Sequence, residues 1–410
     1  MAEPEPIVLQ GRTLPLEGRH VVLGVTGSIA AYKAADLASK LRQAGAELEV
    51  VMTPAATRFV TPLTFQSLSA RPVVIDMFSA AEAEAHVEVA RRADALVIAP
   101  ATADCIAHLA SGATPNMVTL TALATTAPVL IAPAMDNQMW EHPATRANVE
   151  ILRARGVAIV GPASGRLASG RTGPGRLSEP IEIVGALRAL LGATSGDFAG
   201  RHVVVSAGGT REAIDPVRYV GNHSTGMMGF AIAEAARDRG ARVTLVTAPV
   251  ALDTPVGVER VDVTSAEQML AALAAATTES DAIIMSAAPA DFRPAAAVTQ
   301  KIKKTDDRVD MTVEMVKNPD IIATLAGGGV RVGFAAETEN LADFARAKLT
   351  AKRLDLIVAN DVTAAGSGFG TETNEVVIFH ASGESEALPL MSKLAVGHAI
   401  LDRVAKLLRA

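Results

Sequence analysis

Residues Arg19 to Ala55 read RHVVLGVTGSIAAYKAADLASKLRQAGAELEVVMTPA, and this stretch decides the fold of the first half of the chain. The apolar run 21–25 predicts a buried strand, and the small residues TGS at 26–28 predict a turn after it. Apolar residues at helical spacing continue to Leu41, Gly45 stops the helix, and residues 48–52 are predicted as a second strand. A strand, a helix and a strand in this order form a unit whose two strands pair in parallel.

The same order of elements recurs in residues 201–250. A strand, a glycine turn, a loop and a helix ending near Arg239 precede a strand at 243–247. Two such openings far apart predict an α/β fold with two Rossmann-like domains, each with a mostly parallel sheet. The segment 191–200, rich in Gly, Ser and Thr, is expected to link a domain of residues 1–190 to one of residues 201–410. Further short apolar runs predict strands at 95–99, 128–132, 158–160, 282–285, 330–334, 356–359 and 375–380.

The composition excludes several classes of protein. The 410 residues carry a formal net charge of −6, so general nucleic-acid binding is not expected. The one cysteine, Cys105, excludes an intrachain disulfide and a cysteine-rich zinc site, and it is typical of the reducing cytoplasm. No apolar stretch approaches the ~18 residues of a membrane-spanning helix. We therefore expect a cytoplasmic protein without a membrane partner.

Small residues follow the predicted strands of the first half. Free N–H groups at the start of a helix bind anions, so the turn Gly27-Ser28 is a candidate phosphate site, although an ordinary βα turn has the same signature. Ala99 to Ala103 and Ile131 to Met135 end two further strands, and ligands collect at such ends in parallel sheets. The glycine- and arginine-rich segment 160–179 is either a flap over an anionic ligand or a disordered connection. His86, on a helical segment, is either a structural residue or a proton carrier near a cleft.

These motifs resemble the flavin-dependent cysteine decarboxylases of coenzyme A biosynthesis. The resemblance rests on GVTGSIAAYK at 24–33, the His86 segment, APATADCIAHLASG at 99–112, APAMDNQMW at 132–140 and GPGRLSEP at 173–180. It implies a Rossmann-like domain that binds FMN and forms trimers, with His86 as the catalytic histidine. The residues implied to contact FMN are Gly27, Ser28, Ile29, Thr53, Pro100, Ala101 and Thr102.

Two positions depart from the pattern of that family. Asp136 stands where the family has an asparagine that contacts the substrate carboxylate, and this places like charges together unless Asp136 is protonated or turned away. Ser169 stands where the best-known members have a cysteine that donates a proton, and a hydroxyl is a far weaker acid than a thiol of pKa ~8.5. Cys105 is either a substitute proton donor or a buried structural thiol.

Polar and basic residues follow the predicted strands of the second half. A polar loop around Asn222 precedes a helix, where developing negative charge is stabilised. Lysines recur after strand ends, at 301–304, Lys348 and Lys352. Such a run is usually a solvated face, but lysines recurring after strand ends in an acidic protein also suit a polyphosphate.

The second half resembles phosphopantothenate–cysteine ligase, which when fused to the decarboxylase gives the bacterial bifunctional enzymes. The matching strings are AGGTREAIDPVRY at 207–219, GNHSTG at 221–226, ADFRP at 290–294, KIKK at 301–304, VKNPDI at 316–321, GFAAET at 333–338 and LIVANDV at 356–362. The resemblance implies that CTP activates 4′-phosphopantothenate as an acyl-cytidylate, that the amine of cysteine displaces CMP, and that Mg²⁺ screens the triphosphate. It also implies ligase dimers.

By position, Asn222 would stabilise the acyl-cytidylate or its formation. The implied nucleotide site comprises Met285, Ser286, Ala287, Asp291, Lys301, Pro319, Asp320, Ile321, Ile322, Phe334, Lys348 and Lys352. Met227 replaces a lysine that many members have, which removes a positive charge near the loop. The sequence leaves two alternatives open: an active ligase with an impaired or regulatory flavin-binding domain, and a non-catalytic binding partner.

Overall fold

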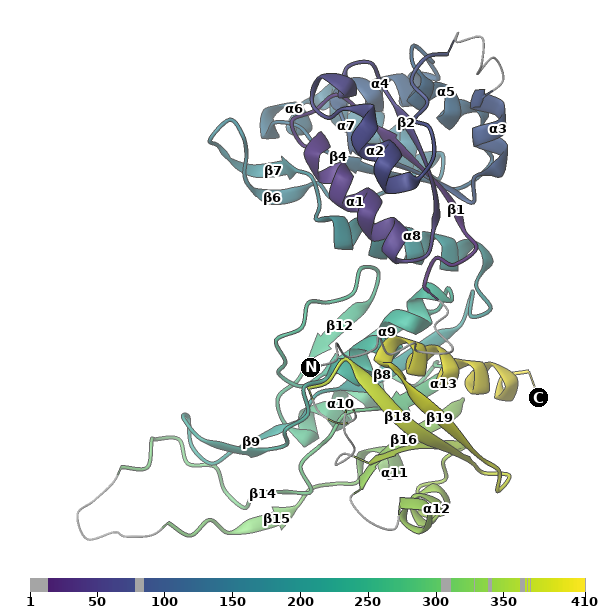
Figure 1. Ribbon diagram of the computed structural model, residues 1–410. Coiled ribbons are helices and arrows are strands. Elements are labelled where there is room, and N and C mark those ends of the chain that lie inside the picture. The colour runs from purple at the N-terminus through teal and green to yellow at the C-terminus, as the bar shows by residue number, and fades with distance from the viewer. Residues whose placement is uncertain are drawn as a thin grey trace, which may run out of the picture. The chain divides into compact units, whose positions relative to one another are not determined.

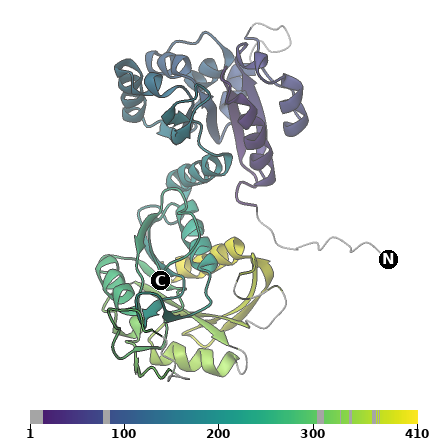
Figure 2. The ribbon, with the colours of Figure 1, turned by 90° about the vertical axis from the view of Figure 1, so that its left-hand side faces the viewer.

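The computed structural model describes residues 14–77, 85–303, 311–327, 329–337, 341–361, 366, 368 and 370–409. The chain divides into two compact units, and the boundary lies between Thr194 and Ser195 (Figures 1 and 2). We call residues 14–194 the first unit and residues 195–409 the second unit. No helix in the described part of the chain has both the length and the apolar character that a membrane span requires.

The first unit is built on a parallel sheet of five strands in the order β2-β1-β3-β4-β5. Helices cover both of its faces, so β1 and β3 are buried along almost their whole length, which explains their continuous apolar sequences. The strands are β1 (His20–Val25), β2 (Glu47–Met52), β3 (Ala95–Ala101), β4 (Val129–Pro133) and β5 (Ala158–Ile159).

Two hydrophobic clusters fix the helices on the two faces of this sheet. α1 (Ala31–Gln43), α2 (Pro62–Ser69) and α8 (Pro180–Ser195) contribute to one cluster. The other face is covered by α3 (Ala85–Arg92), α4 (Ala103–Ser111), α5 (Met117–Ala124) and α7 (Pro143–Ala154). α8 continues to Ser195, into the segment expected as a linker, because Leu191 and Gly192 are still buried against the unit.

The glycine-rich segment 160–179 forms an antiparallel hairpin of β6 (Ala163–Arg166) and β7 (Thr172–Arg176) (Figure 1). This ordered structure favours the flap over the disordered connection. The hairpin contacts the short helix α6 (Asn137–Glu141), and its base is fixed because the Met135 N–H donates to the Gly175 carbonyl at 2.9 Å.

The second unit has a mixed sheet of eight strands in the order β12-β11-β8-β13-β16-β17-β18-β19. The first six strands pair in parallel, and β18 and β19 add an antiparallel edge. The strands are β8 (His202–Ala207), β11 (Arg242–Thr247), β12 (Glu259–Asp262), β13 (Ala282–Met285), β16 (Val330–Glu337), β17 (Leu356–Asp361), β18 (Thr373–His380) and β19 (Ser385–Ser392).

The helices of the second unit also form two layers. α9 (Met227–Asp238) and α13 (Lys393–Leu407) pack against one another and cover one face. The other face carries α10 (Ala266–Ala276), α11 (Ile321–Thr324) and α12 (Leu341–Ala351). Two small ladders extend from the sheet: β9 (Arg211–Ala213) with β10 (Tyr219–Gly221), and β14 (Phe292–Pro294) with β15 (Met315–Lys317).

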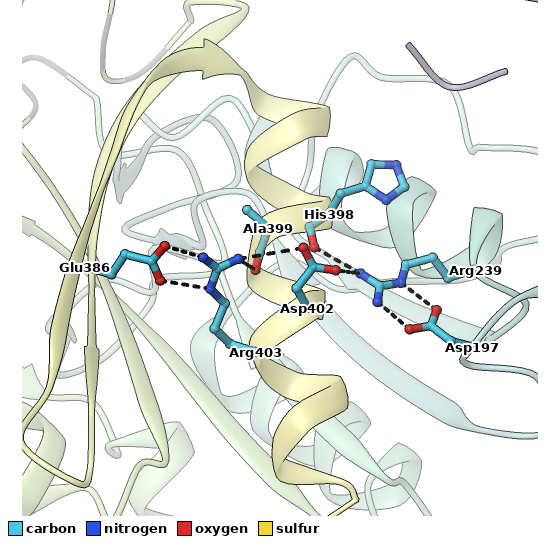
Figure 3. A network of polar contacts seen from close by, with 7 residues as sticks. All are labelled: Asp197, Arg239, Glu386, His398, Ala399, Asp402 and Arg403. Atoms are coloured by element: carbon cyan, nitrogen blue, oxygen red, sulfur yellow. Dashed lines mark hydrogen bonds and ion pairs between the residues drawn. The ribbon is translucent and has the colours of Figure 1, made fainter. Parts of the chain in front are cut away.

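A polar network fastens α13 to the rest of the second unit (Figure 3). The Arg239 guanidinium after α9 pairs with Asp197 and donates to Asp402 of α13 at 2.8 Å. It also donates to the His398 carbonyl at 3.0 Å, while Arg403 pairs with Glu386 of β19. The network thus holds α13, whose first residue, Lys393, lines a cavity of the second unit.

The structure adds edge elements that the sequence analysis missed. β12 is short and charged, and β19 contains Pro389, which a strand tolerates at the edge of a sheet but not in its centre. Neither strand has the uninterrupted apolar run by which the central strands were predicted. The central strands of both sheets are confirmed within about two residues of their expected bounds, apart from β16, which runs three residues further.

Candidate functional site

The first unit has a cavity of about 700 Å³ at the carboxyl ends of β1, β3 and β4. The start of α1, the start of α6 and the β6–β7 hairpin complete its wall. Four of the predicted FMN residues line it, namely Gly27, Ser28, Ile29 and Thr102, as do Asp136 and Ser169. Thr53, Pro100, Ala101 and His86 are not among its lining residues.

The turn after β1 has the local structure of an anion site. A Cβ on Gly27 would lie 2.6 Å from the Ala55 Cβ, so only glycine fits there. The backbone N–H groups of Ser28 and Ile29 have no acceptor among the described residues. Ile29 and Tyr32 are 62 % and 63 % exposed, which leaves apolar surface beside these free donors. Free amides at a helix start, with apolar side chains beside them, suit a phosphate attached to a flat ring.

Thr26 joins the ends of two strands at this cavity. Its hydroxyl donates to the Pro100 carbonyl at 2.6 Å and accepts from the Thr102 N–H at 3.3 Å. Thr102 in turn caps α4, because its hydroxyl accepts from the Cys105 N–H at 3.2 Å. The sequence analysis missed the role of Thr26, which becomes visible only once β1 and β3 lie side by side. Thr53 is buried and its hydroxyl accepts from the Ala56 N–H, so its side chain serves a short 3₁₀ helix.

The predicted proton carriers do not meet at the cavity in a single chain. His86 lies on α3, and its Nδ1 is buried with no hydrogen-bond partner among the described residues. Cys105 is 3 % exposed in the core beneath α4, and burial raises the pKa of its thiol to about 12. A thiol with that pKa, away from the cavity, is a structural residue, and this reading is favoured over the substitute donor.

Asp136 makes three hydrogen bonds at the edge of the first cavity. Its carboxylate caps α6 by accepting from the Gln138 N–H at 3.1 Å. It also accepts from the Ser169 hydroxyl at 2.7 Å and from Arg171 at 3.3 Å. The Ser169 hydrogen bond, the Gln138 N–H and the Arg171 charge hold the pKa of Asp136 below its usual range. Asp136 is therefore an ionised and compensated carboxylate at neutral pH, not a protonated one.

The second unit has a smaller cavity of about 250 Å³, also at the carboxyl ends of parallel strands. Six predicted residues line it: Asn222, Ser286, Ala287, Asp291, Phe334 and Lys348. Hydroxyls at and after the end of β8 hold backbone groups that follow β13. The Ala287 N–H donates to the Ser206 hydroxyl at 3.1 Å, and the Ala290 N–H donates to the Thr210 hydroxyl at 2.9 Å.

The other predicted nucleotide residues lie outside the lining of this cavity. Lys352 and Asp320 pair with each other at 3.1 Å, and the Asp320 carboxylate also caps α11. Ile321 and Ile322 are buried in the core, and the Met285 sulfur accepts from the Ser206 hydroxyl. The lining of this cavity also lacks Lys301 and Pro319.

Lys393 is a lining residue that the sequence analysis missed. It begins α13, is 6 % exposed, and its Nζ donates to the carbonyls of Gly368, at 3.0 Å, and Thr371. Burial lowers the pKa of Lys393, and no carboxylate of the described residues forms an ion pair with it. The sequence around Lys393 does not distinguish a buried lysine at the start of a helix from an exposed one.

A buried clamp holds the backbone next to Lys301. The Asp215 carboxylate is fully buried and accepts from the N–H of Ile302 at 3.1 Å, while Arg218 donates to the Ile302 carbonyl at 3.1 Å. Asp215 and Arg218 also pair with each other at 2.6 Å. The Arg218 guanidinium, with three backbone N–H groups, holds the pKa of Asp215 well below its usual range. The sequence motif DPVR therefore positions the lysine segment.

No cluster of three or more His, Cys, Asp or Glu that could hold a metal ion occurs within the described residues. The described residues that line the second cavity include the cations Lys348 and Lys393 and the carboxylate of Asp291. A Mg²⁺ ion there would depend on oxygen ligands that come with a substrate.

Two family models match the chain, and together they cover both units. Residues 12–192 match the model described as Flavoprotein, and residues 198–408 match the DNA/pantothenate metabolism flavoprotein C-terminal domain. Among solved structures, the C-terminal domain of a coenzyme A biosynthesis bifunctional protein is 37 % identical, with a TM-score of 0.45 over 52 % of this chain and 99 % of its own. An FMN-dependent cysteine decarboxylase of thioviridamide biosynthesis is 34 % identical, with a TM-score of 0.34 over 35 % of this chain and 91 % of its own.

Curated relatives match nearly the full length of the chain. The coenzyme A biosynthesis bifunctional protein CoaBC of Vibrio vulnificus is 47 % identical over 96 % of this chain and 99 % of its own. The protein of that name from Bacillus subtilis is 48 % identical over 96 % and 98 %, and that from Escherichia coli is 46 % identical over 95 % and 98 %. The resemblance found in the sequence is thereby confirmed, and the chain belongs to the family of coenzyme A biosynthesis bifunctional proteins.

Proposed function

We propose that the chain catalyses two consecutive reactions of coenzyme A biosynthesis, one in each unit. The second unit couples 4′-phosphopantothenate to cysteine with CTP, and the first unit converts 4′-phospho-N-pantothenoylcysteine to 4′-phosphopantetheine with FMN. The observation that carries this proposal is that each unit has its own cavity at the carboxyl ends of its parallel strands. The full-length match to relatives named as bifunctional proteins supports it.

The first cavity fits FMN in size and chemistry. Its volume of about 700 Å³ lies within the range of ligand and cofactor sites. The N–H groups of Ser28 and Ile29 would hold the phosphate, and Ile29, Tyr32 and Met139 offer apolar surface to the ring. When bound, FMN supplies a two-electron acceptor, which the reaction needs because the substrate carboxylate has no electron sink β to it.

Protein groups orient the substrate and manage its charge in this cavity. Lys33, Arg166 and Arg176 line the wall and favour an anionic substrate. Among the described lining residues, Asp136 is the one carboxylate, and Ser169 and Arg171 hold it in place. His86 is not a lining residue, so its predicted catalytic role depends on the predicted homo-oligomer, in which a second copy would bring it to the cavity. That assembly stays a prediction, as does the cytoplasmic location.

The second cavity suits the activation of a carboxylate by a nucleotide. Lys348 and Lys393 place positive charge on its wall, and Phe334 offers a flat face for a base. The substrate carboxylate attacks the α-phosphorus of CTP and pyrophosphate leaves. The amine of cysteine then attacks the acyl carbon, CMP leaves, and the Asn222 amide stabilises charge on the acyl-cytidylate. Mg²⁺ would enter on the triphosphate oxygens.

One experiment tests both reactions together. Purified protein is incubated with 4′-phosphopantothenate, cysteine, CTP and Mg²⁺, and the products are identified by mass. We expect 4′-phosphopantetheine, CO₂, CMP and pyrophosphate, and flavin absorbance in the purified protein. A reaction that stops at 4′-phospho-N-pantothenoylcysteine would instead support the alternative of an active ligase with an impaired flavin-binding domain, which the full-length family match does not favour. The absence of any turnover would contradict the proposal.

A further inference from the structure

The tip of the β6–β7 hairpin is fastened to the cavity wall by one carboxylate. Ser169 and Arg171 both lie in the turn between the two hairpin strands, and both donate to Asp136, at 2.7 Å and 3.3 Å. They use different oxygens, since Ser169 binds Oδ2 and Arg171 binds Oδ1. The two departures from the family pattern, Asp136 and Ser169, are therefore one interaction, and Arg171 is its third member.

The base of the hairpin does not depend on this interaction. The Gly175 carbonyl accepts from the Met135 N–H at 2.9 Å, and a Cβ on Gly175 would lie 2.3 Å from the Met135 carbonyl oxygen. The backbone of β7 therefore stays against the residue before Asp136 whether the tip is bound or not. The tip, residues 167–171, is held to the cavity wall by the side chains of Ser169 and Arg171, and it carries three residues that line the cavity, Leu167, Ala168 and Ser169.

The charges around the cavity give Arg171 a second effect. The described lining residues include the cations Lys33, Arg166 and Arg176, and a single carboxylate, that of Asp136. Lys33 and Arg176 are already paired with Glu179, so their attraction for a ligand is reduced. An uncompensated Asp136 would repel any anionic group that enters. Arg171 is not itself a lining residue, and it supplies the opposite charge from outside the cavity.

We propose that Arg171 is a positioning residue for the first unit: with Ser169 it fastens the hairpin tip to Asp136 and cancels the charge of that carboxylate, so that an anionic substrate binds beside it. The inference rests on the proposed decarboxylase reaction. The anionic group of the substrate whose binding Arg171 favours is either its carboxylate or its phosphate. The Arg171 side chain is 52 % exposed, so we expect little effect on global stability and a clear effect on substrate binding.

The test compares steady-state kinetics of the flavin-loaded full chain with 4′-phospho-N-pantothenoylcysteine. We expect Arg171→Gln to raise KM about tenfold with kcat nearly unchanged, because like charges then meet on binding. The double variant Asp136→Asn with Arg171→Gln should recover KM to within about twofold, because no charge is left to cancel. If Ser169 and Arg171 only fastened the tip to Asp136, the double variant would not recover KM. Arg153→Gln is the matched control, since Arg153 is 50 % exposed and paired with Glu150 on α7, away from the cavity.

Two ligands identify this anionic group. If N-pantothenoylcysteine, which lacks the phosphate, shows the same rise in KM, then Arg171 serves the carboxylate. If the inhibition constant of 4′-phosphopantetheine, which lacks the carboxylate, rises instead, then Arg171 serves the phosphate. Either result supports the proposal. An unchanged KM for Arg171→Gln, or a double variant no better than the single one, would overturn it.

A measurement without substrate separates this inference from the proposed function. Hydrogen exchange of the peptide over residues 164–176 reports the tip, where the Leu167 N–H donates to the Arg171 carbonyl and the Gly170 N–H donates to the Leu167 carbonyl. We expect faster exchange in Arg171→Gln than in wild type and in Arg153→Gln. If the wild-type protein does not decarboxylate, the proposed function fails. The exchange difference would still show that Arg171 fastens the hairpin tip. Equal exchange in all three proteins would show that Arg171 does not fasten the tip, even in an active enzyme.

Discussion

Each unit fastens a segment of its chain with an aspartate–arginine pair, but the two aspartates differ in burial. The Asp136 side chain is 24 % exposed and holds the hairpin tip through Arg171 and Ser169. The Asp215 side chain has no exposed surface, and with Arg218 it grips both the N–H and the carbonyl of Ile302. An exposed pair can open without disturbing the core, whereas a buried carboxylate such as that of Asp215 cannot lose its arginine without leaving an uncompensated charge. We therefore infer that the Asp136–Arg171 pair can open and release the hairpin tip, and that the Asp215–Arg218 pair is a fixed part of the fold.

The largest effect is expected from breaking the buried clamp. Asp215→Ala leaves Arg218 without its carboxylate and removes the acceptor of the Ile302 N–H, so the segment carrying Lys301 loses its position. We expect kcat/KM of the CTP-dependent coupling reaction to fall about 100-fold. Asp238→Ala is the control, because Asp238 is likewise a carboxylate with little exposed surface that pairs with an arginine at 2.6 Å, away from the cavity. Equal losses of coupling activity in both variants would contradict a specific role for the clamp.

The clamp also predicts a pH dependence of stability. The pKa of Asp215 is held well below its usual range in the folded chain, so its contribution is complete above the unfolded value of ~3.9 and is lost as the pH falls towards the folded value. We expect the difference in melting temperature between wild type and Asp215→Asn to be constant from about pH 5 to 8 and to shrink below about pH 4. Thermal unfolding followed by circular dichroism measures it. A difference that grows with acidity would contradict the assignment.

A smaller effect is expected from the buried lysine of the second cavity. Lys393→Met keeps the length of the side chain but leaves the carbonyls of Gly368 and Thr371 without their donor. Because Gly368 lines the cavity, we expect KM for CTP to rise about tenfold while the decarboxylation of added 4′-phospho-N-pantothenoylcysteine is unchanged. Lys406→Met, near the end of the same helix and outside the cavity, is the control. A normal KM in Lys393→Met would show that Lys393 has no part in nucleotide binding.

The smallest effect is expected at Cys105. Its thiol is buried outside the first cavity, and burial raises its pKa to about 12, so it cannot replace the proton donor that the family has at the position of Ser169. Cys105→Ser should leave the rate of decarboxylation within about twofold of wild type and lower stability only slightly. A large loss of decarboxylation in a variant that still melts normally would restore Cys105 as a candidate donor.

The sequence predicted what depends on local pattern. The strands β1, β8 and β13 and the helix α1 followed from apolar runs and glycine stops, because burial on both faces of a parallel sheet leaves a continuous apolar signal. Gly27 was singled out by its place after a strand, and Asn222 by its polar loop before a helix and by the family resemblance; both line a cavity. The sequence could not show that Asp136 meets Ser169, or that Asp215 meets Ile302, because these contacts join residues far apart in the chain. The family resemblance placed Ile321 and Ile322 in the nucleotide site by position; their side chains are buried, and their role there stays a prediction.

The most direct test of the central claim, that each unit carries its own reaction, is to supply the two substrates separately to wild type and to Lys348→Met. The Lys348 side chain lines the second cavity and belongs to the second unit alone. We predict that the variant loses CTP-dependent coupling of 4′-phosphopantothenate to cysteine by about 100-fold and still decarboxylates added 4′-phospho-N-pantothenoylcysteine at the wild-type rate. If the two activities fall together in a variant that remains folded, the assignment of one reaction to each cavity is wrong.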